Sequence, residues 1–224
     1  MNIASKWLVC VVLSSLFMVG CTSKVTEKDQ FSGFLPSYDG LQTVKSSTGH
    51  PVLRWVASDF KPSNYDTVVF DRLQWYPAPK PNERVNMQTL QQIQASASDS
   101  VNTVLAQRYQ VVRNVQAVPS GARAMIMRTA ITGVSASDEG MRWYEVVPIA
   151  AVVGTTQALT GHRTQDTELY VEAELVDAAS GKPQARAVRK IFGTTLRNDS
   201  QEITANDFKA TIRDTMRDLE AFLK

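Results

Sequence analysis

The fold class is decided by one stretch of the chain, Leu169-Tyr170-Val171-Glu172-Ala173-Glu174-Leu175-Val176-Asp177-Ala178-Ala179-Ser180-Gly181-Lys182. Its first half alternates apolar residues at odd positions with mostly polar residues at even positions, which is typical of a β-strand with one face toward a core. Residues 177–182 favour a turn, and residues 185–192 return as a second strand. The stretch therefore predicts a β-hairpin, in which Glu172 and Glu174 face Arg186 or Lys190 across the strands.

Upstream of the hairpin, the sequence predicts a βαβ unit. Residues 65–76 contain a β-branched and aromatic run that ends in a proline-rich link. From Met87 to Arg108, apolar side chains recur every three or four residues, which indicates an amphipathic helix. Residues 110–112 then resume strand character. Because a crossover helix joins parallel strands, we expect the two strands to be parallel or nearly so.

Two further segments complete the expected domain. Residues 122–132 carry apolar side chains on both faces, which predicts a central strand. Residues 206–224 predict a C-terminal helix that begins with a capping box formed by Thr204 and Asp207. The buried stripe of this helix is expected to contain Phe208, Ile212, Met216, Leu219 and Leu223, and its solvated face Arg213, Asp214, Arg217, Asp218 and Glu220.

The expected fold is α+β. We predict a two-layer sandwich, in which a mixed sheet of four to five strands packs against two helices in the order β-α-β-β-β-β-α. An apolar insertion at residues 143–160 precedes the last hairpin. It either covers one face of the sheet as part of the core or forms a surface that contacts a partner or the membrane. Its candidate contact residues are Trp143, Tyr144, Val147, Ile149, Val152 and Val153.

The N-terminus has the pattern of an export signal. Lys6 precedes an apolar run over residues 7–19, which is shorter than the roughly 20 residues that a membrane-spanning helix needs. The run ends in Met18-Val19-Gly20-Cys21, which resembles a bacterial lipobox. This resemblance implies cleavage between Gly20 and Cys21 and attachment of diacylglycerol to the Cys21 thiol, with palmitate among the acyl chains.

Three regions follow from this interpretation. Residues 1–20 form a signal peptide, residues 21–30 a lipidated flexible tether, and residues 31–224 a single α+β domain. Thr22 occupies the position directly after the lipidated cysteine. Lipoproteins that are retained in the inner membrane typically carry Asp at this position. We therefore expect an outer-membrane lipoprotein on the periplasmic face, with the inner membrane as the less favoured location.

Composition excludes several classes of function. The formal net charge of the 224 residues is +2, and basic and acidic residues are interspersed, so nucleic-acid binding is not expected. Cys10 leaves with the signal and Cys21 is acylated, which leaves no thiol for a disulfide, a metal site or catalysis. His50 and His162 lie in glycine-flanked loops without a second ligand at metal-binding spacing. We expect no metal and no cofactor.

The search for catalytic groups gives one pair, Glu172 and Glu174. Two residues apart on one strand, their carboxylates would lie about 6–7 Å apart, near the separation in some glycosidases. The facing basic residues explain the pair without catalysis, so we expect no enzyme and no catalytic residue. We predict a non-enzymatic envelope protein that binds a partner protein, peptidoglycan or its own copies, or serves in envelope assembly. The alternatives are a lipid- or small-ligand-binding protein with a cavity between helices and sheet, and an envelope hydrolase.

Several motifs resemble a known family. They are Gly33-Phe34-Leu35-Pro36-Ser37-Tyr38-Asp39-Gly40-Leu41, the strand entry Asn64-Tyr65-Asp66-Thr67-Val68, and Glu172-Ala173-Glu174-Leu175-Val176-Asp177 followed by Ser180-Gly181. Together they resemble the bacterial lipoproteins grouped as the domain of unknown function DUF3313. The resemblance covers nearly all of the mature chain. It implies an envelope location and a fold, but no reaction and no catalytic residue.

Overall fold

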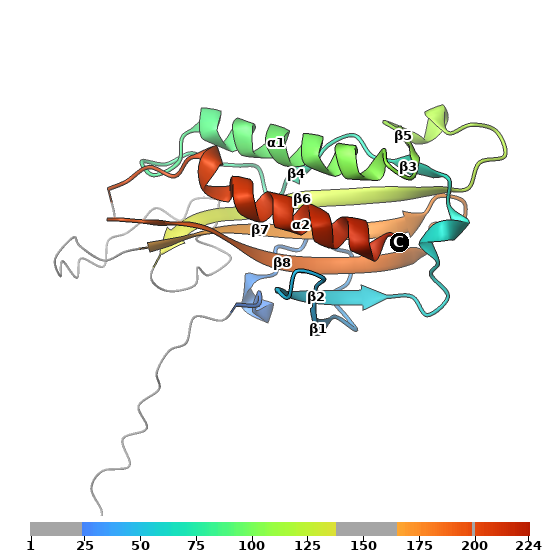
Figure 1. The fold of residues 1–224 in the computed structure, drawn as a ribbon, viewed down its shortest axis with the longest axis horizontal. Helices are drawn as coiled ribbons and strands as arrows, with labels where there is room; N and C mark the ends of the chain where they lie inside the picture. Colours follow the sequence, from blue (N-terminus) through green and yellow to red (C-terminus); the bar gives the residue numbers. More distant parts are fainter. Residues whose placement is uncertain (1–23, 138–164, 199) are drawn as a thin grey trace, which may run out of the picture.

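The computed structural model describes residues 24–137, 165–198 and 200–224 (Figure 1). The two helices are α1, Met87–Leu105, and α2, Lys209–Phe222. Short 3₁₀ turns are η1, Lys28–Gln30, η2, Pro62–Asn64, η3, Val115–Ala117, and η5, Ala205–Phe208. The strands are β1, Gln42–Lys45, β2, Pro51–Val56, β3, Thr67–Val69, β4, Gln74–Trp75, β5, Gln110–Val112, β6, Ala124–Ser137, β7, Gln165–Asp177, and β8, Pro183–Leu196.

The strands form one mixed sheet of eight in the order β1-β2-β8-β7-β6-β3-β5, with β4 paired to β6. The expected four to five strands were therefore too few. The three strands beyond those predicted are β1 and β2, which precede the predicted βαβ unit, and β4, which the sequence pattern merged with β3. Strands β1 and β4 have only four and two residues, too short to show a period of two. As expected for the βαβ unit, β3 and β5 are parallel neighbours, and β6 lies inside the sheet between β7 and β3.

The predicted hairpin forms the centre of the sheet. Strands β7 and β8 pair antiparallel along nearly their whole length, with Ala173 opposite Ala187 and Leu175 opposite Ala185. On the other side of β7, β6 pairs antiparallel with a bulge between Ile131 and Gly133. These three long strands carry the surface on which the helices pack.

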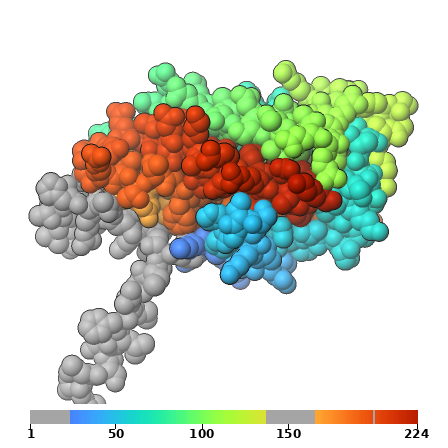
Figure 2. Space-filling model, in the orientation of Figure 1, coloured from blue at the N-terminus to red at the C-terminus, as the bar shows by residue number. Residues whose placement is uncertain are grey.

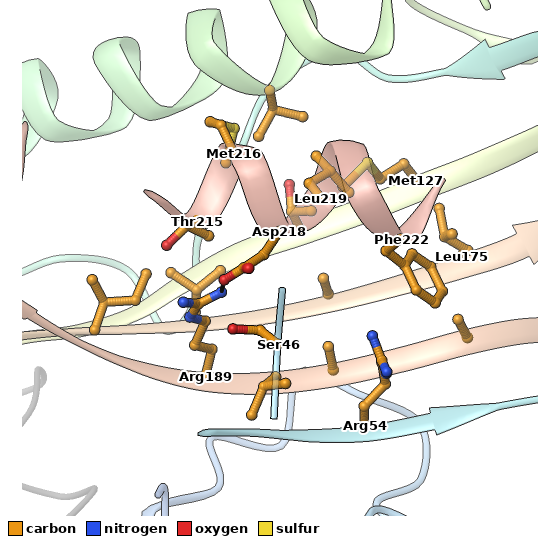
Figure 3. A pocket seen from close by; sticks show the side chains of 18 of the residues that line it. Ser46, Arg54, Met127, Leu175, Arg189, Thr215, Met216, Asp218, Leu219 and Phe222 are labelled. Atoms are coloured by element: carbon orange, nitrogen blue, oxygen red, sulfur yellow. Dashed lines mark hydrogen bonds and ion pairs between the residues drawn. The ribbon is translucent and has the colours of Figure 1, made fainter. Parts of the chain in front are cut away.

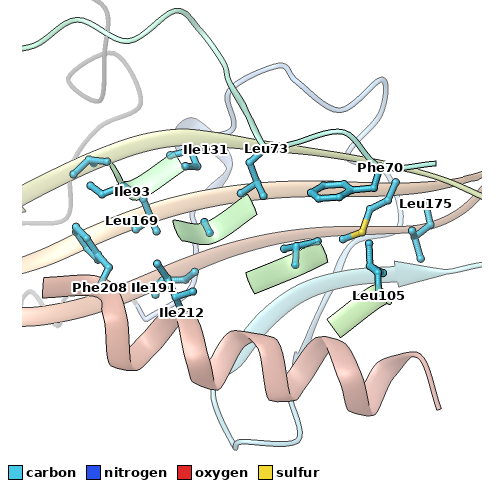
Figure 4. Close-up of a cluster of buried hydrophobic side chains, with 14 of the residues drawn as sticks. Phe70, Leu73, Ile93, Leu105, Ile131, Leu169, Leu175, Ile191, Phe208 and Ile212 are labelled. Atoms are coloured by element: carbon cyan, nitrogen blue, oxygen red, sulfur yellow. The ribbon is translucent and has the colours of Figure 1, made fainter. Parts of the chain in front are cut away.

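Both helices lie side by side over one face of the sheet (Figure 1). The side chain of Asn86 caps α1 by accepting a 2.8 Å hydrogen bond from the backbone N–H of Thr89. The core lies between the helices and the sheet and contains Phe70, Leu73, Ile93, Leu105, Ile131, Leu169, Leu175, Ile191, Phe208 and Ile212 (Figure 4). Each such side chain contributes about 1.5–3 kcal/mol when it is buried.

The C-terminal helix differs from its prediction in one residue that affects the site. The expected capping box is present, since Asp207 Oδ2 accepts a 2.6 Å hydrogen bond from the backbone N–H of Thr204, and a 3₁₀ turn precedes α2. Phe208, Ile212 and Leu223 are buried as predicted. Asp218, assigned to the solvated face, is also buried, and this assignment was wrong.

The opposite face of the sheet is covered by the N-terminal segment. Phe31 stacks on Tyr38 with ring centroids 4.3 Å apart, and Leu35 is buried. Thr26 and Gln30, within the segment expected to be a tether, are also buried. The structure therefore places part of that segment against the domain.

Among the described residues, neither helix combines the length and apolarity that crossing a bilayer requires.

Candidate ligand-binding cavity

A cavity of about 470 Å³ lies between α2 and the sheet (Figure 3). Strands β2, β6, β7 and β8 form its floor, α2 lies over it, and the inner face of α1 closes one side. Its volume falls in the range of small-molecule binding sites, about 300–1,000 Å³. Its apolar lining includes Val52, Leu73, Val101, Met127, Leu169, Val171, Leu175, Ile191, Met216, Leu219 and Phe222.

Small side chains on the two central strands create the space. Ala173 and Ala187 face each other across β7 and β8, and Ala185 follows at the next position on the same face. All three line the cavity. Where larger side chains would fill the layer between sheet and helix, these positions offer only methyl groups. The hairpin pattern predicted that odd positions face the core, but it did not show that three alanines would leave the core hollow there.

A buried ion pair forms the polar wall of the cavity. Arg189 Nη1 lies 2.6 Å from Asp218 Oδ2, and both side chains are less than one tenth exposed. The turn between β1 and β2 completes the set: Ser47 Oγ and the Thr48 backbone N–H each donate a 2.7 Å hydrogen bond to Oδ1, and Thr48 Oγ1 donates one of 2.8 Å to Oδ2. In the space-filling view the β1–β2 turn lies against α2 (Figure 2).

The Asp218 carboxylate is held in its charged form. Burial acts to raise its pKa, but the hydrogen bonds from Ser47 and Thr48 outweigh burial, so the pKa lies well below its ordinary value. The negative charge is thus permanent at neutral pH and is compensated by Arg189. Asp218 therefore holds α2 to the β1–β2 turn and to β8, and this fixes the roof of the cavity.

The remaining charges at the cavity are positive. Arg54 of β2 is half-buried, and its guanidinium carbon lies 5.1 Å from the centre of the Phe222 ring (Figure 3). Lys45, at the end of β1, is exposed and lines the same cavity. Among the described residues, neither cation has a carboxylate within ion-pair distance.

The two glutamates considered for catalysis lie on the other face of the sheet and are bound to neighbours. Tyr38 Oη donates a 2.6 Å hydrogen bond to Glu172 Oε2, and the Ser32 backbone N–H donates one of 2.9 Å to Oε1. Glu174 lies opposite Arg186 in the ladder, as expected, but its ion pair is with Arg128. Both carboxylates are buried.

Burial and the neighbouring Glu172 raise the pKa of Tyr38 to about 12. Tyr38 therefore remains a hydrogen-bond donor to Glu172 at neutral pH.

Most of the other predicted site residues lie outside the part of the chain that the structure describes. The cleavage and lipidation residues Gly20 and Cys21 lie outside the described residues, and so do His162 and the contact candidates Trp143, Tyr144, Val147, Ile149, Val152 and Val153. His50 is exposed, as expected. Within the described part of the chain, no group of three or more His, Cys, Asp or Glu side chains is arranged to hold a metal ion.

Comparison with known proteins gives a family match and closely related sequences. The family model described as "Protein of unknown function (DUF3313)" matches residues 30–219. The uncharacterized lipoprotein YdcL of Escherichia coli (strain K12) is 42% identical over 214 residues, which cover 96% of this chain and 94% of that protein.

Solved structures give only distant similarity. The PelC dodecamer from Paraburkholderia phytofirmans is 12% identical, with a TM-score of 0.40 over 73% of this chain and 95% of that one. Lipoprotein GNA1162 from Neisseria meningitidis is 11% identical, with a TM-score of 0.34 over 70% of this chain and 97% of that one. Likenesses this distant carry no argument about function.

Proposed function

The chain belongs to the DUF3313 family, and we propose that it is a non-enzymatic, lipid-anchored envelope protein that binds a small apolar ligand in the cavity beneath α2. The observation that supports binding is the cavity itself, about 470 Å³ of mainly apolar space over an alanine floor. Apolar surface left uncovered inside a domain is stabilised when a ligand removes it from water, at roughly 25 cal/mol per Å².

The proposed anchor is Cys21, with the chain on the periplasmic face of the outer membrane. The lipobox-like residues at 18–21 and the YdcL relative, named a lipoprotein, both support an acylated cysteine. Thr22, in place of the Asp typical of retained proteins, supports transport to the outer membrane. Labelling cells with radioactive palmitate tests the anchor: the wild type should carry label and Cys21→Ser should not. Label that persists in Cys21→Ser would contradict acylation at this sulfur.

We propose a role without catalysis because the two carboxylates that could have acted together, Glu172 and Glu174, are engaged in structural contacts. Glu172 accepts hydrogen bonds from Tyr38 and Ser32, and Glu174 forms an ion pair with Arg128. A pair of carboxylates in a hydrolase needs one free acid and one free base or nucleophile at the substrate. Binding of a ligand in the cavity needs no such pair.

Native mass spectrometry can test the binding. The full chain, extracted from membranes in a neutral detergent, would be equilibrated with deuterated hexadecanol, a neutral apolar probe. We expect one bound probe on the wild type. Ala187→Leu places a larger side chain on the cavity floor and should abolish the adduct, whereas Ala95→Leu, on the exposed face of α1, should keep it. A wild type without adduct, or an equal adduct on Ala187→Leu, contradicts the proposal.

A further inference from the structure

The charges around the cavity indicate the chemical class of its ligand. Resting on the function proposed above, we infer that the ligand is a single-chain amphiphile with an anionic head group. The head pairs with Arg54, and the chain lies along the alanine floor. Fatty acids and lysophospholipids with a phosphate head share this chemistry.

The charges of the lining residues do not balance. The charged residues that line the cavity include the cations Lys45, Arg54 and Arg189 and the anion Asp218. Arg189 and Asp218 neutralise each other at 2.6 Å. This leaves the two charges of Lys45 and Arg54 without an opposite charge inside the described part of the cavity.

Two other charged residues of the lining do not alter this balance. Arg186 and Glu174 alternate along their strands with the alanines, so their side chains point to the opposite face of the sheet. There, Arg186 donates a 2.5 Å hydrogen bond to the Ser37 carbonyl oxygen, and Glu174 binds Arg128. They contribute to the cavity floor without presenting their charges to a ligand.

Within the described part of the chain, the Arg54 guanidinium is held in place and has N–H groups that are free to bind a ligand. Its guanidinium lies over the face of the Phe222 ring, a contact that leaves the N–H groups along its edge directed outward. Arg186 and Arg189 each donate a hydrogen bond to an oxygen of the protein. Among the described residues, no side chain or carbonyl accepts such a hydrogen bond from the Arg54 guanidinium. A half-buried guanidinium that is already held in place is suited to bind carboxylate or phosphate through two parallel hydrogen bonds.

Arg54 borders the apolar space of the cavity. Arg54 and Phe222 lie toward the C-terminal end of α2, while Asp218 and Arg189 lie farther back along the helix (Figure 3). A chain whose head is bound at Arg54 passes under Leu219 over the alanine floor. An amphiphile satisfies the cation and the apolar wall together, whereas a neutral hydrocarbon leaves Arg54 unpaired.

A competition experiment tests the inference. The full chain in neutral detergent receives equimolar deuterated palmitate and deuterated hexadecanol, which share a chain length and differ in the head group, and native mass spectrometry compares the two adducts. We expect the wild type to prefer palmitate by about tenfold or more, as for a charge-assisted hydrogen bond. A parallel sample receives palmitoyl lysophosphatidic acid in place of palmitate. Comparing its adduct with that of palmitate shows whether the site prefers a phosphate or a carboxylate head group.

Three variants separate this inference from the function on which it rests. Arg54→Gln should lose the preference for palmitate and still bind hexadecanol, which also shows that its cavity is intact. Arg72→Gln removes an exposed arginine that lies next to Asp71 and should behave like the wild type. Equal binding of both probes by the wild type, or an unchanged preference in Arg54→Gln, overturns the anionic head group and leaves the apolar site standing. Absence of both adducts from the wild type overturns the proposed function itself.

Discussion

Tyr38 and Glu172 are 134 residues apart in the chain, and a 2.6 Å hydrogen bond joins their side chains. It fastens the segment that follows the lipobox-like residues to β7, in the centre of the sheet. The buried Thr26 lies five positions after Cys21 in the sequence, and a chain of this length spans at most about 17 Å when fully extended. If Cys21 carries the acyl chains, the domain is therefore held close to the bilayer surface.

The first prediction concerns this hydrogen bond. Tyr38→Phe removes the donor and leaves the buried Glu172 carboxylate with the Ser32 backbone N–H as its described donor. We expect a loss of about 1–3 kcal/mol in the free energy of unfolding and faster amide exchange over residues 31–38, measured by urea denaturation and hydrogen exchange. Tyr76→Phe, at an exposed tyrosine, is the control and should change stability by less than about 0.5 kcal/mol. Equal behaviour of the two variants would contradict the role given to Tyr38.

The second prediction is a dependence on alkaline pH. Burial and Glu172 raise the pKa of Tyr38 from 10.0 to about 12, so the folded state favours the protonated phenol. The resulting stability is fully present below pH 10 and is lost as the pH rises from 10 to 12. Urea midpoints measured across this window should fall more steeply for the wild type than for Tyr38→Phe. Tyr65, whose pKa is also raised to about 12, is common to both proteins and cancels in the difference.

Parts of this fold follow from local sequence and parts do not. The alternation at 169–176 and the three-to-four-residue spacing from Met87 predicted the central hairpin and α1, because each pattern lies within one element. The burial of Glu172 could not be found in this way, since the segment that covers it comes from residues 26–38. Alternating polar residues indicate a face that is not packed by helices, and an irregular segment can still cover that face.

The cavity shows the same limit. A charged residue on an amphipathic helix indicates the solvated side by default, so Asp218 was assigned to water; its partners Ser47 and Thr48 lie in a turn about 170 residues earlier. The signal that was available is the three small residues at core-facing positions of the hairpin, Ala173, Ala185 and Ala187. Small residues facing a helix with Thr215 and Asp218 on its inner side indicate a gap in the core.

The third prediction tests the support of the cavity roof. Asp218→Asn removes the charge that compensates Arg189, and breaking a buried pair on one side costs about 3–5 kcal/mol. We expect a loss of this order by urea denaturation. The matched control on the same helix is Asp214→Asn, because Asp214 pairs with the exposed Arg217 at 3.2 Å, and such a pair contributes about 0–1 kcal/mol. Similar losses in the two variants would show that the Asp218 contacts do not hold α2.

The fourth prediction follows from the lowered pKa of Asp218. The unfolded chain titrates this carboxyl near 3.8, and the folded state well below that value. The stability contributed by the charged form is therefore complete above about pH 4 and is lost as the pH falls through the lower, folded pKa. The difference in unfolding free energy between wild type and Asp218→Asn should be constant from pH 7 to about 5 and should shrink below pH 4. A difference that stays the same down to pH 2.5 would rule out the linkage.

The last prediction concerns the ion pair on the face covered by the N-terminal segment. Lys190 Nζ lies 2.8 Å from Glu168 Oε1, and both side chains are 1% exposed. Lys190→Met should cost about 3–5 kcal/mol, because it leaves a buried carboxylate without its cation.

The double variant Glu168→Gln, Lys190→Met should recover more than half of this loss. It removes both charges, while the amide oxygen of the introduced glutamine can still accept the 2.8 Å hydrogen bond that Tyr170 Oη donates to Glu168. A double-mutant cycle by urea denaturation measures the coupling, which we expect to exceed about 1 kcal/mol. Lys224→Met, at an exposed pair with Glu220, should cost less than about 0.5 kcal/mol. Purely additive costs at positions 168 and 190 would mean that the fold does not depend on pairing these two charges.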